Sequence, residues 1–514
     1  MPVSVKAALN RSNSTTSRTA RSSGLLSAAV VGLSCLAICG VLVAAYYRGG
    51  DQDEYSTMYF ADSTIPFSTA WKEVWPTETN PPFFYIIARL FVPITGQRLL
   101  SCRLINIIPL VFLLTWFLHT ALRRPENRQF LLCLAILVFS GWYFVYFFPY
   151  YRSYCWQYCA AVVFVGAAAI GHLNRDTRPD PFQLIALPFL LILHQITALY
   201  ACVLLIPLVS IDLIRRNFIR AGCLIIVSLL SSILVIYFTW LQLRQFSAVM
   251  LAVSWIEPLG PLSALRMILL NFVPSLGSNW AALLTVGLIA VVPSYRPRGP
   301  TSSLVWVIAC AAIGASALVL MINQRYPLAV DYYFSFLAVE AIVVIALLIT
   351  PVWTTKPWIA ALIAANAGLY IMYSAAVVLH DRELLEDADM VAQLAARCPE
   401  TRIHAGSRPP TLGPDPVKVI APPESEQIAL RDLAATDHLT LLPLGPDAPG
   451  ICPAIYWTEY RAPNHRQIAQ YGGDIAEAAN EYAGFGIDQV NLGHTKAIQL
   501  RNSFAIVLVV SAPR

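Results

Sequence analysis

Charge is scarce in this sequence. Only 13% of its 514 residues are Asp, Glu, Lys or Arg, whereas 57% are hydrophobic, and the mean hydropathy is +0.60. Soluble globular domains carry about 25% charged residues, so the composition excludes a water-soluble protein of this size. We expect membrane lipids to surround much of the chain, and we expect no nucleic-acid partner.

Motifs that bind structural metals are also missing. None of the 11 cysteines lies in a Cys-x-x-Cys pair or in a Cys/His cluster, so the sequence predicts no metal site. The sequence assigns no cofactor, and a divalent cation remains an alternative. Most cysteines fall in apolar segments, where they act as small buried hydrophobic residues. Only Cys398 and Cys452 lie after residue 380, where a disulfide in an oxidising compartment is an open alternative to two free thiols.

Long apolar runs recur along the first 380 residues. Because ~20 apolar residues cross a bilayer as a helix, hydropathy predicts about eleven spans. The run 182–193 is short and has a re-entrant or tilted course as its alternative. The predicted spans are residues 24–46, 99–120, 130–148, 155–171, 182–193, 195–213, 221–243, 279–293, 303–322, 331–350 and 357–379. This part of the chain is therefore expected to be an all-α polytopic membrane domain.

Basic residues predict how the chain is oriented. The first 23 residues contain Lys6, Arg11, Arg18 and Arg21 and no acidic residue, so the positive-inside rule places the N-terminus in the cytoplasm. This segment is rich in Ser, Thr and Arg, and we expect it to be disordered. A cleaved signal peptide is the alternative, but the apolar region is too long for one. Alternating the spans from here places residues 47–98, and everything after residue 380, on the outer face.

The composition changes after residue 380. Residues 381–514 hold 17 of the 30 acidic residues and 11 basic ones, a net charge of −6, whereas residues 1–380 have a net charge of +11. Helical periodicity is seen over residues 383–398. Short apolar runs predict strands at residues 402–405, 418–421, 439–444, 452–457 and 504–510. We expect a small extracytoplasmic α/β domain over residues 381–514, following a membrane domain over residues 24–380.

One loop concentrates the acidic residues of the membrane domain. Residues 49–90 hold six of the 13 acidic residues found before residue 381. Asp51, Asp53 and Glu54 follow the first span within a few residues, so they lie at the membrane surface. A sharp turn at Asn80-Pro81-Pro82 and three aromatic residues come later in the loop. A solvated loop is the alternative explanation for the charge, and these two features favour a functional site.

Arginines with aromatic neighbours mark other outer ends of the spans. Arg152 lies in the aromatic run 143–154, where its guanidinium needs an anionic partner, either a lipid phosphate or a substrate phosphate. Arg325-Tyr326 repeats this pairing. His194 lies at an outer turn, at a depth where polar residues are rare and usually have partners. An ordinary hydrogen-bonding role is the alternative for His194.

These groups are the parts that sugar transfer from a lipid phosphate requires. The phosphate is already a good leaving group, so the site needs cations that neutralise its growing charge. A carboxylate must accept the proton of the acceptor hydroxyl, and the polyprenyl tail needs an apolar groove. An Asp of the first outer loop with Arg152 and Arg325 supplies this set if the three converge in space.

The order of the motifs carries a family resemblance. One span is followed by Asp53-Glu54-Tyr55, then by Asn80-Pro81-Pro82-Phe83-Phe84-Tyr85, and then by Arg103-Leu104. In this order the sequence resembles the GT-C superfamily of integral membrane glycosyltransferases, in the branch of protein O-mannosyltransferases and the lipid A aminoarabinose transferase. The later Arg152, His194 and Arg325-Tyr326 also fall in family-like order. The resemblance covers about the first 210 residues well and the later spans weakly.

The resemblance implies a function and a set of site residues. It implies transfer of a sugar from a polyprenyl-phosphate donor to a hydroxyl of a glycan, lipid or protein acceptor, with inversion, at the outer face of a bacterial inner membrane. The expected catalytic residues are Asp53 as the base, Asp51 as its rival, and Glu54. The expected phosphate-binding residues are Arg152, Arg325 and Arg103. The expected substrate-binding residues are Tyr85, Tyr151, Tyr154, His194 and Tyr326.

Asn80 stands where the family often has His or Asp, which weakens a metal or acid role at that position.

Two other function classes stay open. A transporter or lipid flippase would place ionisable groups near the midplane of its spans, whereas only Asp212 and Glu340 are acidic residues inside or at the edge of predicted spans. The second class is a catalytically inactive relative that binds glycolipid.

Overall fold

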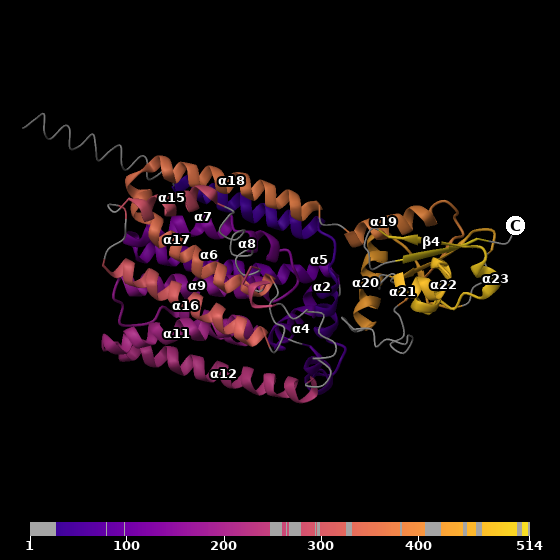
Figure 1. The fold of residues 1–514 in the computed structure, drawn as a ribbon, viewed down its shortest axis with the longest axis horizontal. Coiled ribbons are helices and arrows are strands. Elements are labelled where there is room, and N and C mark those ends of the chain that lie inside the picture. Colours follow the sequence, from indigo (N-terminus) through magenta and orange to yellow (C-terminus); the bar gives the residue numbers. More distant parts are fainter. Residues whose placement is uncertain are drawn as a thin grey trace, which may run out of the picture.

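The computed structural model describes two parts, a helical bundle and a small α/β domain (Figure 1). The described residues are 27–511 except residues 79, 97, 247–259, 264, 267–278, 293–294, 296–298, 325–330, 381–382, 407–422, 446–449, 459–464 and 501–505. The predicted disordered segment 1–23 lies outside them. The predicted fold class, a polytopic helical membrane protein with a C-terminal α/β domain, is confirmed.

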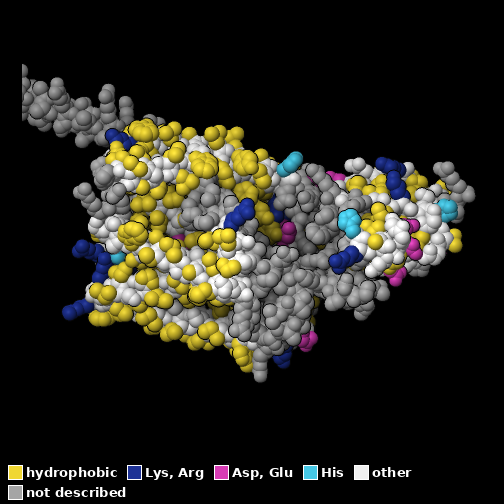
Figure 2. Space-filling model, in the orientation of Figure 1, with side chains coloured by type: hydrophobic (Ala, Val, Ile, Leu, Met, Phe, Trp, Pro, Cys, Tyr) yellow, Lys and Arg dark blue, Asp and Glu magenta, His cyan; other side chains and the backbone are white. Residues whose placement is uncertain are grey.

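Eight helices of the described residues are long and apolar enough to cross a membrane. They are Ser27–Tyr47, Leu99–Arg123, α9 (Tyr154–Leu173), α11 (Gln195–Ile214), α12 (Phe218–Phe246), α16 (Pro300–Asn323), α17 (Ser335–Thr355) and α18 (Pro357–His380). Each matches one predicted span. Many hydrophobic side chains are exposed on the face of the bundle that Figure 2 shows, as expected for a surface in contact with lipid.

The other three predicted spans do not form single helices of membrane-crossing length, which for residues 182–193 agrees with the short run in the sequence. Residues 182–193 and 279–293 give helices of only 12 residues, α10 (Pro181–Ile192) and α15 (Trp280–Val291). Residues 130–148 form two helices, α7 (Arg128–Phe139) and α8 (Trp142–Phe147). The break falls at Gly141, where a Cβ atom would lie 3.2 Å from the carbonyl oxygens of Leu137 and Val138. Hydropathy alone does not register such a local break.

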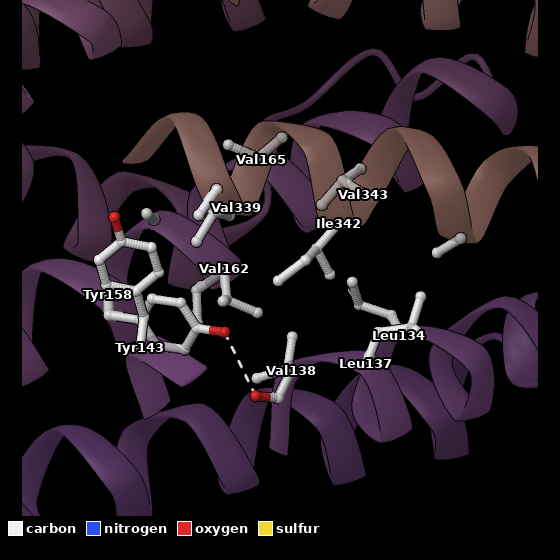
Figure 3. Close-up of a cluster of buried hydrophobic side chains, with 14 of the residues drawn as sticks. Leu134, Leu137, Val138, Tyr143, Tyr158, Val162, Val165, Val339, Ile342 and Val343 are labelled. Carbon is white, nitrogen blue, oxygen red and sulfur yellow. Dashed lines mark hydrogen bonds between the residues drawn. The ribbon is translucent and has the colours of Figure 1, made fainter. Parts of the chain in front are cut away.

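Helix α9 is the centre of the bundle. All of its residues except the last are buried, and α6 (Ile107–Arg123), α10 and α17 pack around it. Its many Ala and Gly residues let the neighbouring backbones approach closely. Figure 3 shows apolar side chains of α7, α9 and α17 interlocking, with the Tyr158 hydroxyl donating to the Val138 carbonyl at 3.2 Å. The buried hydroxyl thereby keeps a hydrogen-bond partner inside the apolar core.

The loop after the first helix forms a layer of short helices across one end of the bundle. It contains α2 (Gln52–Phe60), α3 (Phe67–Thr69), η1 (Ala70–Val74), η2 (Trp75–Thr77) and α4 (Phe83–Thr95). The chain then enters the bundle through α5 (Leu99–Arg103), η3 (Leu104–Asn106) and α6. Aromatic rings fill this layer; for example, Trp75 is fully buried and donates its indole N–H to the Phe60 carbonyl at 2.9 Å.

The C-terminal part is a five-stranded sheet flanked by helices. Its strands are β1 (Arg402–Ala405), β2 (Leu441–Leu442), β3 (Ala454–Thr458), β4 (Thr495–Gln499) and β5 (Ile506–Val510), in the order β2-β1-β3-β5-β4. The helices are α19 (Glu383–Ala395), α20 (Pro423–Thr436), α21 (His465–Gln470), α22 (Ile475–Ala483) and α23 (Gln489–Leu492). β1 pairs in parallel with β2 and β3, whereas β5 is antiparallel to β3 and β4.

Side chains of β3 alternate between two small cores, as strand geometry requires. Ile455 and Trp457 pack on the side of α19 and α20, while Ala454 and Tyr456 pack on the side of α22. The predicted helix and four of the five predicted strands are present, and residues 418–421 lie outside the described part. β4 was not predicted, because Lys496 and Gln499 interrupt its apolar pattern.

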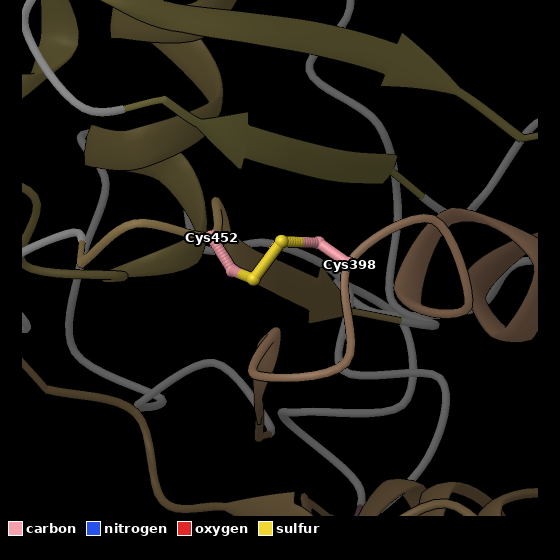
Figure 4. The surroundings of a disulfide bond; sticks show 2 residues. All are labelled: Cys398 and Cys452. Carbon is pink, nitrogen blue, oxygen red and sulfur yellow. A yellow bond between two sulfur atoms is a disulfide. The ribbon is translucent and has the colours of Figure 1, made fainter.

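A disulfide joins the segment after α19 to the segment just before β3. It links Cys398 and Cys452, whose Cα atoms are 5.6 Å apart (Figure 4). Of the two alternatives that the sequence allowed for these cysteines, the structure contains the disulfide. The nine other cysteines are free thiols.

Candidate active site

Helix α2 brings the three expected carboxylates to one place. Asp51 is its N-cap, with an oxygen that accepts the Asp53 N–H at 2.8 Å. Glu54 reaches back and accepts the Asp51 N–H at 3.1 Å, which completes a capping box. Gly50 precedes the cap, and a Cβ atom there would lie 2.3 Å from the Tyr55 hydroxyl. Only glycine therefore lets the chain turn this closely from the first helix into α2.

Glu54 and Arg103 form a fully buried ion pair beneath this turn. The guanidinium binds the carboxylate in a two-pronged way, through Nε at 2.9 Å and Nη2 at 2.7 Å. Its remaining N–H groups donate to the carbonyls of Ala45, Arg48 and Gly49 at 2.7 to 3.0 Å. All five donors of Arg103 are thus in use. The pair fastens the end of the first helix to α2 and α5.

The Glu54 carboxylate is held in its charged form. It also accepts the Tyr151 N–H at 2.7 Å, and the Arg48 guanidinium lies 3.8 Å away. Burial alone raises the pKa of Glu54, but the charge and hydrogen bonds of Arg103 outweigh burial and lower the pKa below its ordinary value. With every oxygen engaged, Glu54 is equipped to organise the site rather than to exchange a proton.

Asp53 and Arg152 form a second ion pair that faces outward. Asp53 Oδ1 lies 3.0 Å from Arg152 Nη2, and the Asp53 side chain is 36% exposed, against 8% for Arg152. Arg152 Nη1 donates to the Tyr85 hydroxyl at 3.0 Å. Its Nε is buried and has no hydrogen-bond partner in the described part of the chain. A buried guanidinium N–H without an acceptor is costly, so an anionic ligand at this point would be favoured.

His194 contributes a second unpaired donor near Arg152. It caps α11, with Nδ1 accepting the Ile196 N–H at 3.2 Å, so Nε2 carries the proton of the neutral ring. That Nε2 is buried and has no partner among the residues described. Burial and the charge of Arg152 lower the pKa of His194 to about 3, so the ring stays neutral at physiological pH. The ring packs on Tyr333, with centroids 4.3 Å apart.

The surroundings of Asp51 change its protonation. Burial and the charge of Asp53 raise the pKa of Asp51 to about 6, against smaller opposing effects of Tyr150 and Arg48. One Asp51 oxygen is committed to the α2 cap. Asp51 is therefore titrated near neutral pH and partly occupied by a structural hydrogen bond.

Glu78, which precedes the proline-containing turn, also acts on Arg152 through its charge. Burial lowers the pKa of Arg152, but the charges of Asp53 and Glu78 outweigh burial and hold the pKa well above its ordinary value. Gln242 at the end of α12 donates to the carbonyls of Glu78 at 2.6 Å and Asn80 at 3.0 Å. Sequence reasoning gave neither Glu78 nor Gln242 a role. The position of Glu78 two residues before Asn80-Pro81 was the only available signal.

The remaining expected residues fall into two groups. Tyr151 and Tyr154 are buried among other rings, Tyr151 against Phe84 at 5.9 Å and Tyr154 against Phe147 at 5.0 Å, so the structure shows them as part of the aromatic packing. Arg325 and Tyr326 lie outside the described residues. The described residues contain no group of three or more His, Cys, Asp or Glu side chains arranged to hold a metal ion.

Comparisons with known proteins identify the fold. No family model matches the sequence, and no curated protein matches it. The chain is similar to the crystal structure of ArnT from Cupriavidus metallidurans bound to undecaprenyl phosphate, with a TM-score of 0.53 and 11% identity over 94% of this chain and 99% of that chain. The apo state of ArnT gives a TM-score of 0.52, 10% identity and the same coverage. The chain therefore shares the fold of ArnT, which is the fold that the resemblance in motif order implied.

Proposed function

We propose that this protein is a membrane glycosyltransferase that moves a sugar from a polyprenyl-phosphate donor to an acceptor hydroxyl. One observation carries the proposal. Two buried N–H donors, Arg152 Nε and His194 Nε2, have no partner within the described residues; Arg152 pairs with the partly exposed Asp53 carboxylate, and its charge acts on His194. A phosphate satisfies both donors, and a carboxylate beside it is placed to take a proton. The fold shared with ArnT, which was crystallised with undecaprenyl phosphate, supports this donor class.

The reaction uses the groups in separate roles. Arg152 and neutral His194 donate hydrogen bonds to the donor phosphate, whose charge grows as its bond to the anomeric carbon breaks. The acceptor oxygen forms the new bond to that carbon from the opposite face, and its proton passes to Asp53. The products are the glycosylated acceptor and the polyprenyl phosphate. Because a phosphate competes for Arg152, donor binding also releases Asp53 from its ion pair.

We assign Glu54 and Arg103 to positioning rather than to chemistry. Both are saturated with internal hydrogen bonds, so neither has an atom left for a substrate. We therefore no longer assign phosphate binding to Arg103 and keep that role for Arg152, and Asp53 is favoured over Glu54 as the base. Asp53 is favoured over Asp51 because it pairs with Arg152, whereas Asp51 is committed to the helix cap.

We further propose that the site opens on the outer face of a bacterial inner membrane. Two features support this sidedness. Helix α20 of the C-terminal domain packs on α2, so that domain and the site share one side of the membrane. The domain contains the Cys398–Cys452 disulfide, and disulfides persist in oxidising compartments such as the periplasm. The cationic N-terminal segment then lies in the cytoplasm.

Substitution of Asp53 tests the proposal. Asp53→Asn keeps the shape of the side chain but removes the base, and we expect transfer to fall by about 10²–10⁴-fold, the usual effect of a general base. The assay follows loss of radiolabelled sugar from undecaprenyl-phosphate-linked sugars in membranes containing the protein. Thermal unfolding of the purified variant serves as the folding control.

The matched control for this substitution is Asp51→Asn, which preserves the N-cap. We expect it to retain most of the activity. Activity lost in Asp51→Asn and kept in Asp53→Asn would move the base to Asp51. Activity kept in both variants would end the assignment of a carboxylate base on α2.

A further inference from the structure

A second polar pocket lies at the opposite end of the bundle. Helix α9 begins beside Arg152 and runs for 20 residues, about 30 Å at ~1.5 Å per residue. Near its far end is a pocket of about 240 Å³, lined by the last turn of α6, Arg124 and the segment Asp176–Pro181 before α10. Lys and Arg side chains are visible at this end of the bundle, away from the C-terminal domain (Figure 2). The pocket shares no residue with the candidate active site.

The charge of the pocket is positive. Arg123, Arg124 and Arg178 line it, together with two carboxylates. Both carboxylates are already engaged, because Asp176 is paired with Arg124 and Asp180 caps α10 by accepting the Phe182 N–H at 2.8 Å. Neither Arg123 nor Arg178 has a carboxylate partner in the part of the chain that the structure describes.

A buried hydroxyl points to a ligand. Thr120 lines the pocket and is only 2% exposed, and its Oγ1 has no hydrogen-bond partner among the described residues. An unsatisfied buried hydroxyl costs about 1–3 kcal/mol, which a ligand oxygen would offset. The N-terminus of α10, a 12-residue helix, also borders the pocket and favours negative charge there.

We propose that this pocket binds the phosphate of an anionic lipid headgroup. Guanidinium groups match phosphate through their forked donors. The pocket lies at the end of Leu99–Arg123, a helix long and apolar enough to cross a membrane, and the ends of such helices meet the headgroup region. The same turns of α6 expose Leu118 and Leu122 on the outside of the bundle, at 62% and 74%. Acyl chains can therefore lie along α6 while the headgroup occupies the pocket, which favours a lipid over a soluble phosphate.

Native mass spectrometry of the full-length protein tests the pocket. Phosphatidylglycerol, phosphatidylcholine and inorganic phosphate are titrated separately. In the double variant Arg123→Gln/Arg178→Gln, we expect the affinity for phosphatidylglycerol to fall about thirty-fold, since each cation near an anionic lipid contributes ~1 kcal/mol and ~1.4 kcal/mol is a factor of ten. Thr120→Val, which removes only the hydroxyl, is expected to weaken the same binding several-fold.

The matched control is Arg128→Gln, which removes an exposed cation at the same end of the bundle but outside the pocket. It should leave binding unchanged. An equal loss in this control would mean that general surface charge, rather than the pocket, holds the lipid. Equal affinity for phosphatidylcholine, or inorganic phosphate bound as tightly as the lipid, would also overturn the proposal. None of these outcomes depends on sugar transfer, so the active-site proposal is tested separately.

Discussion

At the scale of single residues, the buried pair of Glu54 and Arg103 determines whether the site can form. Replacing Glu54 by Gln leaves a guanidinium in the interior without its counter-charge, and removing one partner of a buried pair costs about 3–5 kcal/mol. We expect Glu54→Gln to lower the melting temperature of the purified protein markedly. Arg103→Lys should not preserve stability, because an ammonium cannot supply five donors in a forked arrangement.

Asp53→Asn is the natural comparison for this pair of variants. Its carboxylate is partly exposed and the charge of Glu78 also acts on Arg152, so its loss should lower stability less than the loss of Glu54 while strongly reducing activity. A melting temperature for Glu54→Gln equal to that of wild type would show that the buried pair is not structurally required.

Asp51 gives a pH dependence of stability. Its pKa in the folded protein is raised to about 6 by burial and by the charge of Asp53, above the ~3.9 of an unfolded chain. The folded state therefore binds this proton more tightly than the unfolded state does. Protonation of Asp51 stabilises the folded state at low pH, and this stabilisation is lost as the pH rises from about 4 to about 6. We expect Asp51→Asn, which stays neutral and keeps the cap, to be more stable than wild type above about pH 6.

Melting temperatures at pH 4.5 and pH 7.5 measure this effect. Comparing the variant with wild type separates the effect of Asp51 on stability from that of Glu54. The pKa of Glu54 is lowered, so its charge stabilises the folded protein near neutral pH and this stabilisation is lost on acidification. A difference between variant and wild type that is the same at both pH values would contradict the proton-linked role of Asp51.

The sequence predicts residue types at the site better than residue roles. Of the expected residues, Asp53 and Arg152 form an ion pair, and the charge of Arg152 acts on His194; their roles stay predictions. The roles of the individual residues were not predictable, because they depend on which N–H donors already have hydrogen-bond partners within the protein. Arg103 donates hydrogen bonds to backbone carbonyls 54 to 58 residues away in the chain, and a local sequence pattern does not predict such contacts.

At the scale of elements, the contact between α2 and α20 links the soluble domain to the site. Ala429 of α20 is buried in the apolar cluster that includes Tyr55 of α2. Around it, Asp432 lies 3.0 Å from Arg98 and accepts the Tyr55 hydroxyl at 3.4 Å. Since α2 also carries Asp53, the position of the base depends on a domain that starts more than 300 residues later in the chain.

Disrupting this contact should reduce activity without unfolding the bundle. Ala429→Arg places a charge in the buried contact, which is unfavourable without a partner. We expect a large loss of transfer activity and faster hydrogen exchange of α2 amides, while exchange in α9 is unchanged. The matched control, Ala435→Arg, changes an exposed residue of the same helix and should have no effect. Normal exchange and activity in Ala429→Arg would rule out coupling between the domain and α2.

Elements with a strong period were predictable, and interrupted ones were not. The long spans follow from apolar length, and Glu383–Ala395 follows from helical spacing. Two errors have a physical cause in tertiary contacts. The break between α7 and α8 depends on the close approach of Gly141 to the preceding turn, and β4 is held mainly by pairing with β5.

At the scale of the whole molecule, the disulfide reports on which side of the membrane the site lies. Cys398 and Cys452 are 54 residues apart, and closing a loop of that length stabilises a domain by ~4 kcal/mol in the chain-entropy view. We expect the double variant Cys398→Ser/Cys452→Ser to lower the unfolding temperature of the C-terminal domain. Cys310→Ser, which removes an exposed free thiol of α16, is the control and should leave it unchanged.

The same pair of cysteines tests sidedness in cells. If the domain lies outside, a membrane-impermeant maleimide should label Cys398 and Cys452 in a variant lacking the other cysteines only after treatment with a reductant. A cytoplasmic domain would keep both thiols reduced, and they would be labelled without reductant once the cells are permeabilised. Because α20 packs on α2, that second result would place Asp53 and Arg152 on the cytoplasmic face as well. An outer-face glycosyltransferase would then be excluded, whatever the activity of the Asp53 variant.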